Sequence, residues 1–342
     1  MINGVPRILI VRLSAIGDVV RVLPALHSLR TALPNAQIDW VVEDKAVDVL
    51  SGHSEIDRVI EFQRGAGGRA STARFMALCK EIRAARYEVV FDFHGILKSG
   101  AITRLSGATD RYGFAPPRAQ EASHLALNHA LKLDSPNLSR VEENLRLVEM
   151  LAPRTNEPGH SLFVPPDVAD HVDQYFDSTF DAGKRVVAVH APMDRDEKRW
   201  PAKRFAELCD MLLSDGRFQV VLTWGPGQEK AVEEVARLSR RGVMITPHFD
   251  TLKHYIHFIE LADLYVGGDT GPMHIADEVG TPVVAIFGDT DPRKHAPDRQ
   301  PHEVIEGTGN TAAEKLESIS AETVYDACVR IIFGTPIGRP TK

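Results

Sequence analysis

The chain has 342 residues, of which 43% are hydrophobic and 25% are charged, and its formal net charge is −7. The length favours two domains, because single hydrophobic cores stop growing at about 250–300 residues, and the composition is that of a globular protein. The negative charge excludes a global basic field of the kind that draws proteins to nucleic acid, so we predict no nucleic-acid partner.

The cysteines and the first residues indicate a compartment. Cys79, Cys209 and Cys328 lie far apart without CxxC spacing, which predicts buried thiols in a reducing compartment rather than disulfides or a zinc site. The apolar run before Arg12 is too short for a signal-peptide core, and no segment approaches the about 18 apolar residues of a membrane span. We therefore predict a cytoplasmic protein.

Short apolar runs alternate along the chain with segments of helical period. In chain order the runs are RILIVRL, IDWVVE, EVVFDF, RVVAVHA, QVVLTW, VMITP, DLYVGG and PVVAIFG. Continuous runs rich in Val and Ile are typical of strands covered on both faces, as in parallel α/β sheets. A segment rich in Pro and Gly after Pro153 divides two such series, which predicts domains at residues 1–158 and 159–342. The predicted fold class is α/β, with two Rossmann-like doubly wound domains that face a central cleft.

The first strand leads into a turn with one glycine and an acid, Gly17 and Asp18, before a helix predicted over residues 19–33. One interpretation is that Asp18 caps this helix. The other applies if the C-terminal half holds a nucleotide diphosphate. Asp18 would then be a base that takes a proton from an incoming hydroxyl. The residues alone favour neither.

Two more segments of the N-terminal half carry candidate acceptor contacts. Arg64 and Arg69 lie in a glycine-containing segment that could hold an anion through forked hydrogen bonds, although a mobile surface loop is the commoner case. Lys98 and Ser99 follow the strand EVVFDF, together with His94. We predict that they line the same wall of the cleft.

In the C-terminal half, three loops follow strands and are predicted to meet at one edge of a sheet. Loop 190–205 contains Lys198, which can neutralise a diphosphate, although a charged run is usually a solvated face. Loop 224–229 ends at Glu229, where a carboxylate can bind ribose hydroxyls. A glutamate that only stabilises the helix dipole is the simpler interpretation of that segment.

The third loop contains Asp269, Thr270 and Gly271, between the end of a strand and the start of a helix. Pro272 favours a helix start, and the amides and dipole of a helix N-terminus suit a phosphate. The alternative is that Asp269 or Thr270 is merely an N-cap. His274, one turn into the helix, is by itself more typical of a helix face, but its spacing from Asp269 lets both reach one pocket.

Five segments together resemble one family. They are ILIVRLSAIGDVVRVLPAL, DFHGILKSGAITRL, EKRWP, WGPGQE and GGDTGPMHIADEVGTPVVAIFGDTDP, and they span residues 7 to about 295. In this order they resemble the bacterial ADP-heptose:lipopolysaccharide heptosyltransferases of glycosyltransferase family 9, which have the GT-B fold. WVVE and HGILKS look most like heptosyltransferase I.

The resemblance implies transfer of L-glycero-D-manno-heptose, with inversion, from ADP-heptose to the Kdo region of a Kdo₂-lipid A type acceptor. It implies that Asp18 is the general base. It implies donor contacts from Lys198, Glu229, Asp269, Thr270, Gly271 and His274. The acceptor contacts that we predict beside these are Arg64, Arg69, Lys98 and Ser99. No metal signature appears, so we predict a site without metal or cofactor.

Several positions depart from the family's pattern. Ala15, Pro192 and Met193 stand where hydroxyl side chains are expected, and Asp289 stands where a proline or small residue is expected. These departures leave open a different sugar donor, or the acceptor of heptosyltransferase II or III, within the GT-B transferases. A nucleotide-sugar-binding module without activity is the alternative from another class, and a dinucleotide oxidoreductase lacks its GxGxxG. We expect a monomer whose contact with the inner membrane, if any, is peripheral.

Overall fold

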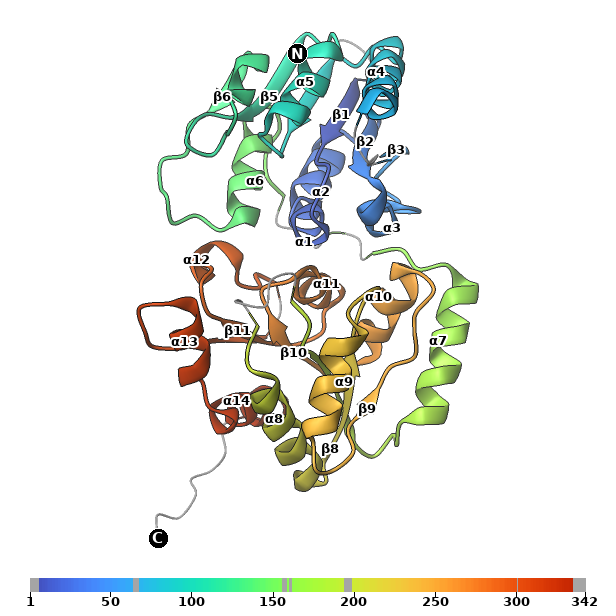
Figure 1. The fold of residues 1–342 in the computed structure, drawn as a ribbon. Helices are drawn as coiled ribbons and strands as arrows, with labels where there is room; N and C mark the ends of the chain where they lie inside the picture. The colour runs from blue at the N-terminus through green and yellow to red at the C-terminus, as the bar shows by residue number, and fades with distance from the viewer. Residues whose placement is uncertain are drawn as a thin grey trace. The chain divides into compact units, whose positions relative to one another are not determined.

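The computed structural model describes residues 6–63, 68–155, 159, 162–193, 199–299 and 301–334, without the side chains of residues 68–70. The chain forms two compact units, Met1–Phe163 and Val164–Lys342. Figure 1 follows the chain through the elements of each unit. The units divide after Phe163, whereas the sequence places the division at residue 158, and residues 156–158 lie outside the described part.

In the described part of unit 1, six strands form one parallel sheet in the order β3-β2-β1-β4-β5-β6. They are β1 (Arg7–Val11), β2 (Gln37–Glu43), β3 (Arg58–Phe62), β4 (Val89–Asp92), β5 (Asp110–Phe114) and β6 (His129–Leu131). The strand order reverses between β1 and β4. The carboxyl ends of these two strands therefore flank a topological switch point, where ligands bind in open α/β sheets.

Helices connect these strands. They are α1 (Ile16–Val20), α2 (Leu23–Ala32), α3 (Val47–Leu50), α4 (Gly68–Ala84), α5 (Leu97–Leu105) and α6 (Arg140–Glu149), with the 3₁₀ segments η1 (Asp44–Ala46) and η2 (Ser123–Ala126). A core of apolar side chains from β1, β2 and β4 packs against α4 and α5, while α2 packs with α6. The prediction of a single helix over residues 19–33 is wrong. A new helix starts at Leu23, because Pro24 suits a first helical turn and cannot continue a helix from before it.

Unit 2 repeats the pattern. Its described strands form a parallel sheet in the order β12-β11-β10-β7-β8-β9. They are β7 (Arg185–His190), β8 (Phe218–Thr223), β9 (Met244–Ile245), β10 (Leu264–Gly268), β11 (Val283–Phe287) and β12 (His302–Glu306). The order reverses between β7 and β10, so the switch point of unit 2 lies at the ends of these strands.

The helices of unit 2 form two groups, which can be followed in Figure 1. Helices α8 (Ala202–Asp215), α9 (Glu229–Leu238) and α14 (Ala321–Phe333) lie together over one apolar core of the sheet. Helices α7 (Pro166–Thr179), α10 (Leu252–Leu261) and α11 (Gly271–Val279) form the other group. The short helices α12 (Pro292–His295) and α13 (Ala312–Ser318) complete the unit.

The observed architecture confirms the predicted α/β class with two doubly wound parallel sheets. The predicted burial of Cys79, Cys209 and Cys328 is also confirmed, and all three are free thiols. Within the described ranges, no helix combines the length and the apolar character needed to cross a membrane.

Candidate active site

Asp18 lies on α1, directly after β1 at the switch point of unit 1. Ala15 occupies the N-cap position of α1, so the interpretation of Asp18 as the capping residue is wrong. The Asp18 carboxylate forms ion pairs with the guanidinium groups of Arg12 and Arg21. Both arginines are buried, whereas 33% of the Asp18 side chain is exposed. The site thus presents a carboxylate that is paired with two buried cations and that solvent can reach.

A third guanidinium group adds to this positive environment. Arg118 interacts electrostatically with Asp18 and Arg12, donates from Nε to Glu143 at 2.9 Å, and lies 4.7 Å from the centre of the Phe114 ring. Burial lowers the pKa of Arg12 to about 10 and lowers that of Arg118, against the opposing attraction of Asp18. Arg12 therefore stays protonated at neutral pH. Concentrated positive charge of this kind suits an anionic ligand.

The turn after β4 is organised by one buried carboxylate. Asp92 is 1% exposed and accepts hydrogen bonds from the backbone N–H groups of His94 and Gly95, both at 3.0 Å, and from the Ser99 hydroxyl at 2.9 Å. Burial raises the pKa of Asp92, and these hydrogen bonds oppose that effect. Ser99 is fully buried, and it also forms hydrogen bonds with the backbone of Ile96. These structural contacts explain a serine at this position without any contact to an acceptor substrate.

His94 cannot act readily as a base in this structure. Its Nδ1 accepts a hydrogen bond from the Leu13 N–H at 3.2 Å, so the neutral ring carries its proton on Nε2. Burial, reinforced by the charge of Arg12, lowers the pKa of His94 to about 3. The ring is therefore a neutral hydrogen-bond donor at neutral pH.

Lys98 reaches the same edge of the sheet from the first turn of α5. Its ammonium group pairs with Glu43, at the end of β2, over 2.9 Å, and lies 5.4 Å from the centre of the Phe62 ring. Glu43 and Asp92, the last residues of β2 and β4, are buried in these interactions, whereas 33% of the Asp18 side chain is exposed. The structure thus brings Asp18, His94 and Lys98 to one edge. Arg64 and the side chain of Arg69 lie outside the described residues.

In unit 2, the loop from β10 to α11 contains Asp269 and Thr270 at the switch point. Thr270 is the N-cap residue of α11 by its extended backbone, but its side chain makes no capping hydrogen bond. Its hydroxyl instead makes a long 3.4 Å hydrogen bond to the Gly268 carbonyl. Helix capping therefore does not account for the threonine, whereas an anion at this helix N-terminus would.

Asp269 is held by two histidines. Its carboxylate lies 3.3 Å from Nε2 of His274, which is 4% exposed on α11, and 3.8 Å from Nδ1 of His295 on α12. Asp269 and His274, which the sequence predicts to reach one pocket, are in contact with each other. Gly271 is the first residue of α11, and Pro272 follows in its first turn as predicted.

The other two loops of unit 2 begin at the neighbouring strand ends. Lys198 lies outside the described residues. Glu229 is the half-buried first residue of α9, and its preceding turn needs glycine at Gly227, where φ is +81°. Met193, in the loop after β7, packs against Gly268 so closely that a Cβ there would lie 2.9 Å from its sulfur. Met193 therefore fills space at this loop, and it supplies no hydroxyl.

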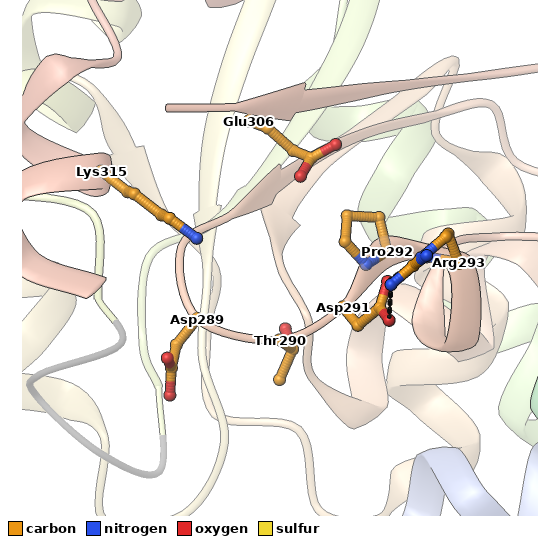
Figure 2. A pocket seen from close by; sticks show the side chains of 7 residues that line it. All are labelled: Asp289, Thr290, Asp291, Pro292, Arg293, Glu306 and Lys315. Atoms are coloured by element: carbon orange, nitrogen blue, oxygen red, sulfur yellow. Dashed lines mark hydrogen bonds and ion pairs between the residues drawn. The ribbon is translucent and has the colours of Figure 1, made fainter. Parts of the chain in front are cut away.

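A pocket of about 420 Å³ lies beside this edge, at the loop after β11 (Figure 2). It is lined by Asp289, Thr290, Asp291, Pro292, Arg293, Glu306 and Lys315. Arg293 is engaged with Asp291 through two hydrogen bonds, of 2.9 and 2.8 Å, which lower the pKa of that carboxyl group. With three acids against two bases, the pocket suits hydroxyl groups better than phosphate.

Beneath the loops, His190 gives a prediction for stability. It is 2% exposed at the end of β7, Nδ1 lies 3.0 Å from the Thr223 hydroxyl, and burial lowers its pKa to about 3. Between about pH 6.5 and 3, the unfolded chain binds a proton at His190 that the folded chain does not bind. The free energy of unfolding therefore decreases by about 1.4 kcal/mol for each unit by which the pH is lowered. Urea unfolding at about pH 7.5 and 5 should show a shallower loss for His190→Gln than for the parent protein. Equal losses in both would contradict this assignment.

Among the residues that the structure describes, no group of three or more His, Cys, Asp or Glu side chains is arranged to hold a metal ion. Sequence reasoning missed the arginine environment of Asp18. Arg12 and Arg21 flank the acid closely in sequence, and that spacing was a usable signal. Arg118 comes from a distant loop, and no local sequence pattern indicated its place near Asp18.

Comparison with known proteins identifies the family of the chain. The sequence profile described as "Glycosyltransferase family 9 (heptosyltransferase)" matches residues 75–325. Lipopolysaccharide heptosyltransferase 1 of Escherichia coli (strain K12) is 30% identical over 298 residues, which cover 84% of this chain and 89% of that protein.

Solved structures agree with these matches. The family 9 glycosyl transferase from Veillonella parvula DSM 2008 has a TM-score of 0.85 at 21% identity, and covers 96% of this chain and 98% of its own. The structure of E. coli heptosyltransferase WaaC with ADP-2-deoxy-2-fluoro heptose has a TM-score of 0.73 at 26% identity, over 93% of this chain and 97% of its own. The two-sheet architecture is therefore the GT-B fold.

Proposed function

The chain belongs to glycosyltransferase family 9, the heptosyltransferases, and we propose that it transfers L-glycero-D-manno-heptose from ADP-heptose to the Kdo region of the lipopolysaccharide inner core. The observation that carries the proposal is the accessible carboxylate of Asp18, set among buried arginines at the switch point of unit 1. Such a group combines a base with binding capacity for an acidic acceptor.

In the proposed reaction, the Asp18 carboxylate takes the proton of an acceptor hydroxyl as that oxygen attacks the anomeric carbon of the donor. The bond from this carbon to the diphosphate breaks through an oxocarbenium-like transition state, and ADP leaves from the opposite face with inversion. His94 is a neutral donor, and Glu43 and Asp92 are buried in other contacts. These contacts favour Asp18 for the proton transfer.

We propose that the acceptor binds unit 1. An acceptor carboxylate would share the guanidinium groups that pair with Asp18. Their attraction for the Asp18 carboxylate would then be weaker, and Asp18 would be a better base. Lys98 would add a further cation from α5, and Arg64 and Arg69 stay predictions. Ser99, which is fully buried, would act by shaping the turn rather than by touching the acceptor.

We propose that the donor binds unit 2. The N-terminus of α11 and Thr270 would receive the diphosphate, Glu229 the ribose, and Lys198 would neutralise charge on the departing ADP. Asp269 and His274, joined over 3.3 Å, would hold the shape of this loop. Because fixed protein charges would bind the diphosphate and stabilise the departing ADP, the proposed reaction needs no metal ion or cofactor.

The test is ADP release from ADP-heptose, with and without deacylated Kdo₂-lipid A, in the presence of EDTA, with the product followed by mass. We expect release that depends on the acceptor, and a product heavier by one heptose. Release only with an already heptosylated core would show a heptosyltransferase II or III acceptor instead. Donor binding without release on any core would contradict the transfer that we propose. A monomeric state and peripheral contact with the inner membrane stay predictions.

A further inference from the structure

A row of polar side chains lies beneath the β10–α11 loop, on one face of the unit 2 sheet. His190 is the register partner of Thr223 on β8 and of Gly267 on β10, so these positions share the last row at the carboxyl end. Tyr265 precedes Gly267 by two residues and lies on the same face. Its ring passes over Gly267, where a Cβ would lie 2.6 Å from the phenol oxygen. The missing side chain of Gly267 therefore lets the Tyr265 hydroxyl extend toward the loop.

The Tyr265 hydroxyl is buried without a hydrogen-bond partner among the described residues. Tyr265 is 0% exposed, and its ring stacks on His190 with a centroid distance of 6.4 Å and an interplanar angle of 23°. Leaving a buried hydroxyl unsatisfied is costly, and a phenylalanine would fill the same volume without that cost. The hydroxyl thus has a hydrogen bond to donate that no described residue accepts.

Thr270 is the group that the phenol faces at the loop. Burial raises the pKa of Tyr265 well above its ordinary value, as do Tyr255 and Asp269, while the nearby Thr270 hydroxyl opposes them. The two hydroxyls are near enough to interact, but their distance and angle do not meet those of a hydrogen bond. Thr270 holds only its long 3.4 Å contact to Gly268. Two hydroxyl groups at this loop therefore have unused hydrogen-bonding capacity, and the phenol keeps its proton at neutral pH.

We propose that Tyr265 is a positioning residue for the diphosphate of the donor and acts through Thr270. When a nucleoside diphosphate occupies the N-terminus of α11, the Tyr265 hydroxyl donates to Oγ1 of Thr270. The Thr270 hydroxyl then turns from the Gly268 carbonyl and donates to a phosphate oxygen. Each hydroxyl both donates and accepts in this chain, so the two bonds strengthen each other. The inference rests on the proposed function only in that ADP binds at this loop.

The experiment measures ADP binding by titration calorimetry for the parent protein, Tyr265→Phe, Thr270→Val and the double variant. We expect Tyr265→Phe to weaken ADP binding by about three- to tenfold, the worth of one hydrogen bond. In the Thr270→Val background the same change should have no further effect, because the group through which it acts is gone. The melting temperature without ADP should stay the same or rise, since the lost hydroxyl had no partner.

Tyr255→Phe is the matched control. Tyr255 is 5% exposed, its hydroxyl also lacks a partner, and its ring meets His190 edge-on, but it lies on α10 and carries no role in the proposed chain of hydrogen bonds. We expect its ADP affinity to match that of the parent protein.

The outcomes separate this inference from the proposed function. If the parent protein binds no ADP, the proposed donor site fails. If it binds ADP and Tyr265→Phe binds equally well, the role of Tyr265 is overturned. Additive losses in the double variant would also overturn it, because they would mean that Tyr265 does not act through Thr270.

Discussion

Replacing Asp18 by asparagine is expected to lower kcat by at least about 10²-fold, the lower range of what a general base contributes. The amide is nearly the same shape as the carboxylate and still offers Arg12 and Arg21 an oxygen, but it cannot take a proton from the acceptor. ADP binding should be unchanged, because the proposed nucleotide site lies on the other unit. The measurement is turnover at saturating donor and acceptor, together with ADP affinity.

Asp110→Asn is the matched control for this loss. Asp110 begins β5, at the amino edge of the same sheet, and pairs with His129 over 2.8 Å at a side-chain exposure of 40%. The Asp110→Asn substitution removes the same charge from the same unit but leaves the carboxyl edge of the sheet unchanged. We therefore expect its kcat to stay near that of the parent protein. Turnover by Asp18→Asn at the level of this control would remove Asp18 from the role of base.

The second large effect is expected from Asp92→Ala, which should destabilise unit 1 by about 3–5 kcal/mol. The alanine leaves three donors without their acceptor in a site that is 1% exposed: the N–H groups of His94 and Gly95, and the Ser99 hydroxyl. It also removes a negative charge near the buried Arg12. The turn after β4 should lose its shape, and transfer activity should fall with it.

Asp92→Asn separates hydrogen bonding from charge. Its amide oxygen can still accept from His94 and Gly95, and the Ser99 hydroxyl can turn to the Ile96 carbonyl, 2.9 Å away. We expect a loss of about 1 kcal/mol for this variant. Urea unfolding gives the size of each loss, and peptide-resolved hydrogen exchange should assign it to unit 1. An alanine variant as stable as the parent protein would disprove the role of Asp92 in holding the turn.

Seven of the eight strands that the sequence predicts are buried on both faces, and the eighth, VMITP, contains the edge strand β9. β1, β2, β4, β7, β8, β10 and β11 are almost entirely buried, and a continuous apolar run is the local signature of that burial. The edge strands β3, β6 and β12 were missed, because their side chains are largely exposed or half-buried. β5 was missed because Arg111 and Gly113 interrupt its apolar run.

By itself, the sequence determined the α/β class, the two series of strands and the loops at their ends. It also placed Asp18 beside the first strand and Asp269, Thr270 and His274 together, because turn chemistry and helix spacing are local properties. Only the tertiary structure decided which groups surround those residues. Arg118 comes to Asp18 from a distant loop, and the Tyr265 ring stacks on His190 of another strand. Burial and partners depend on segments far apart in the chain, and local pattern does not carry that information.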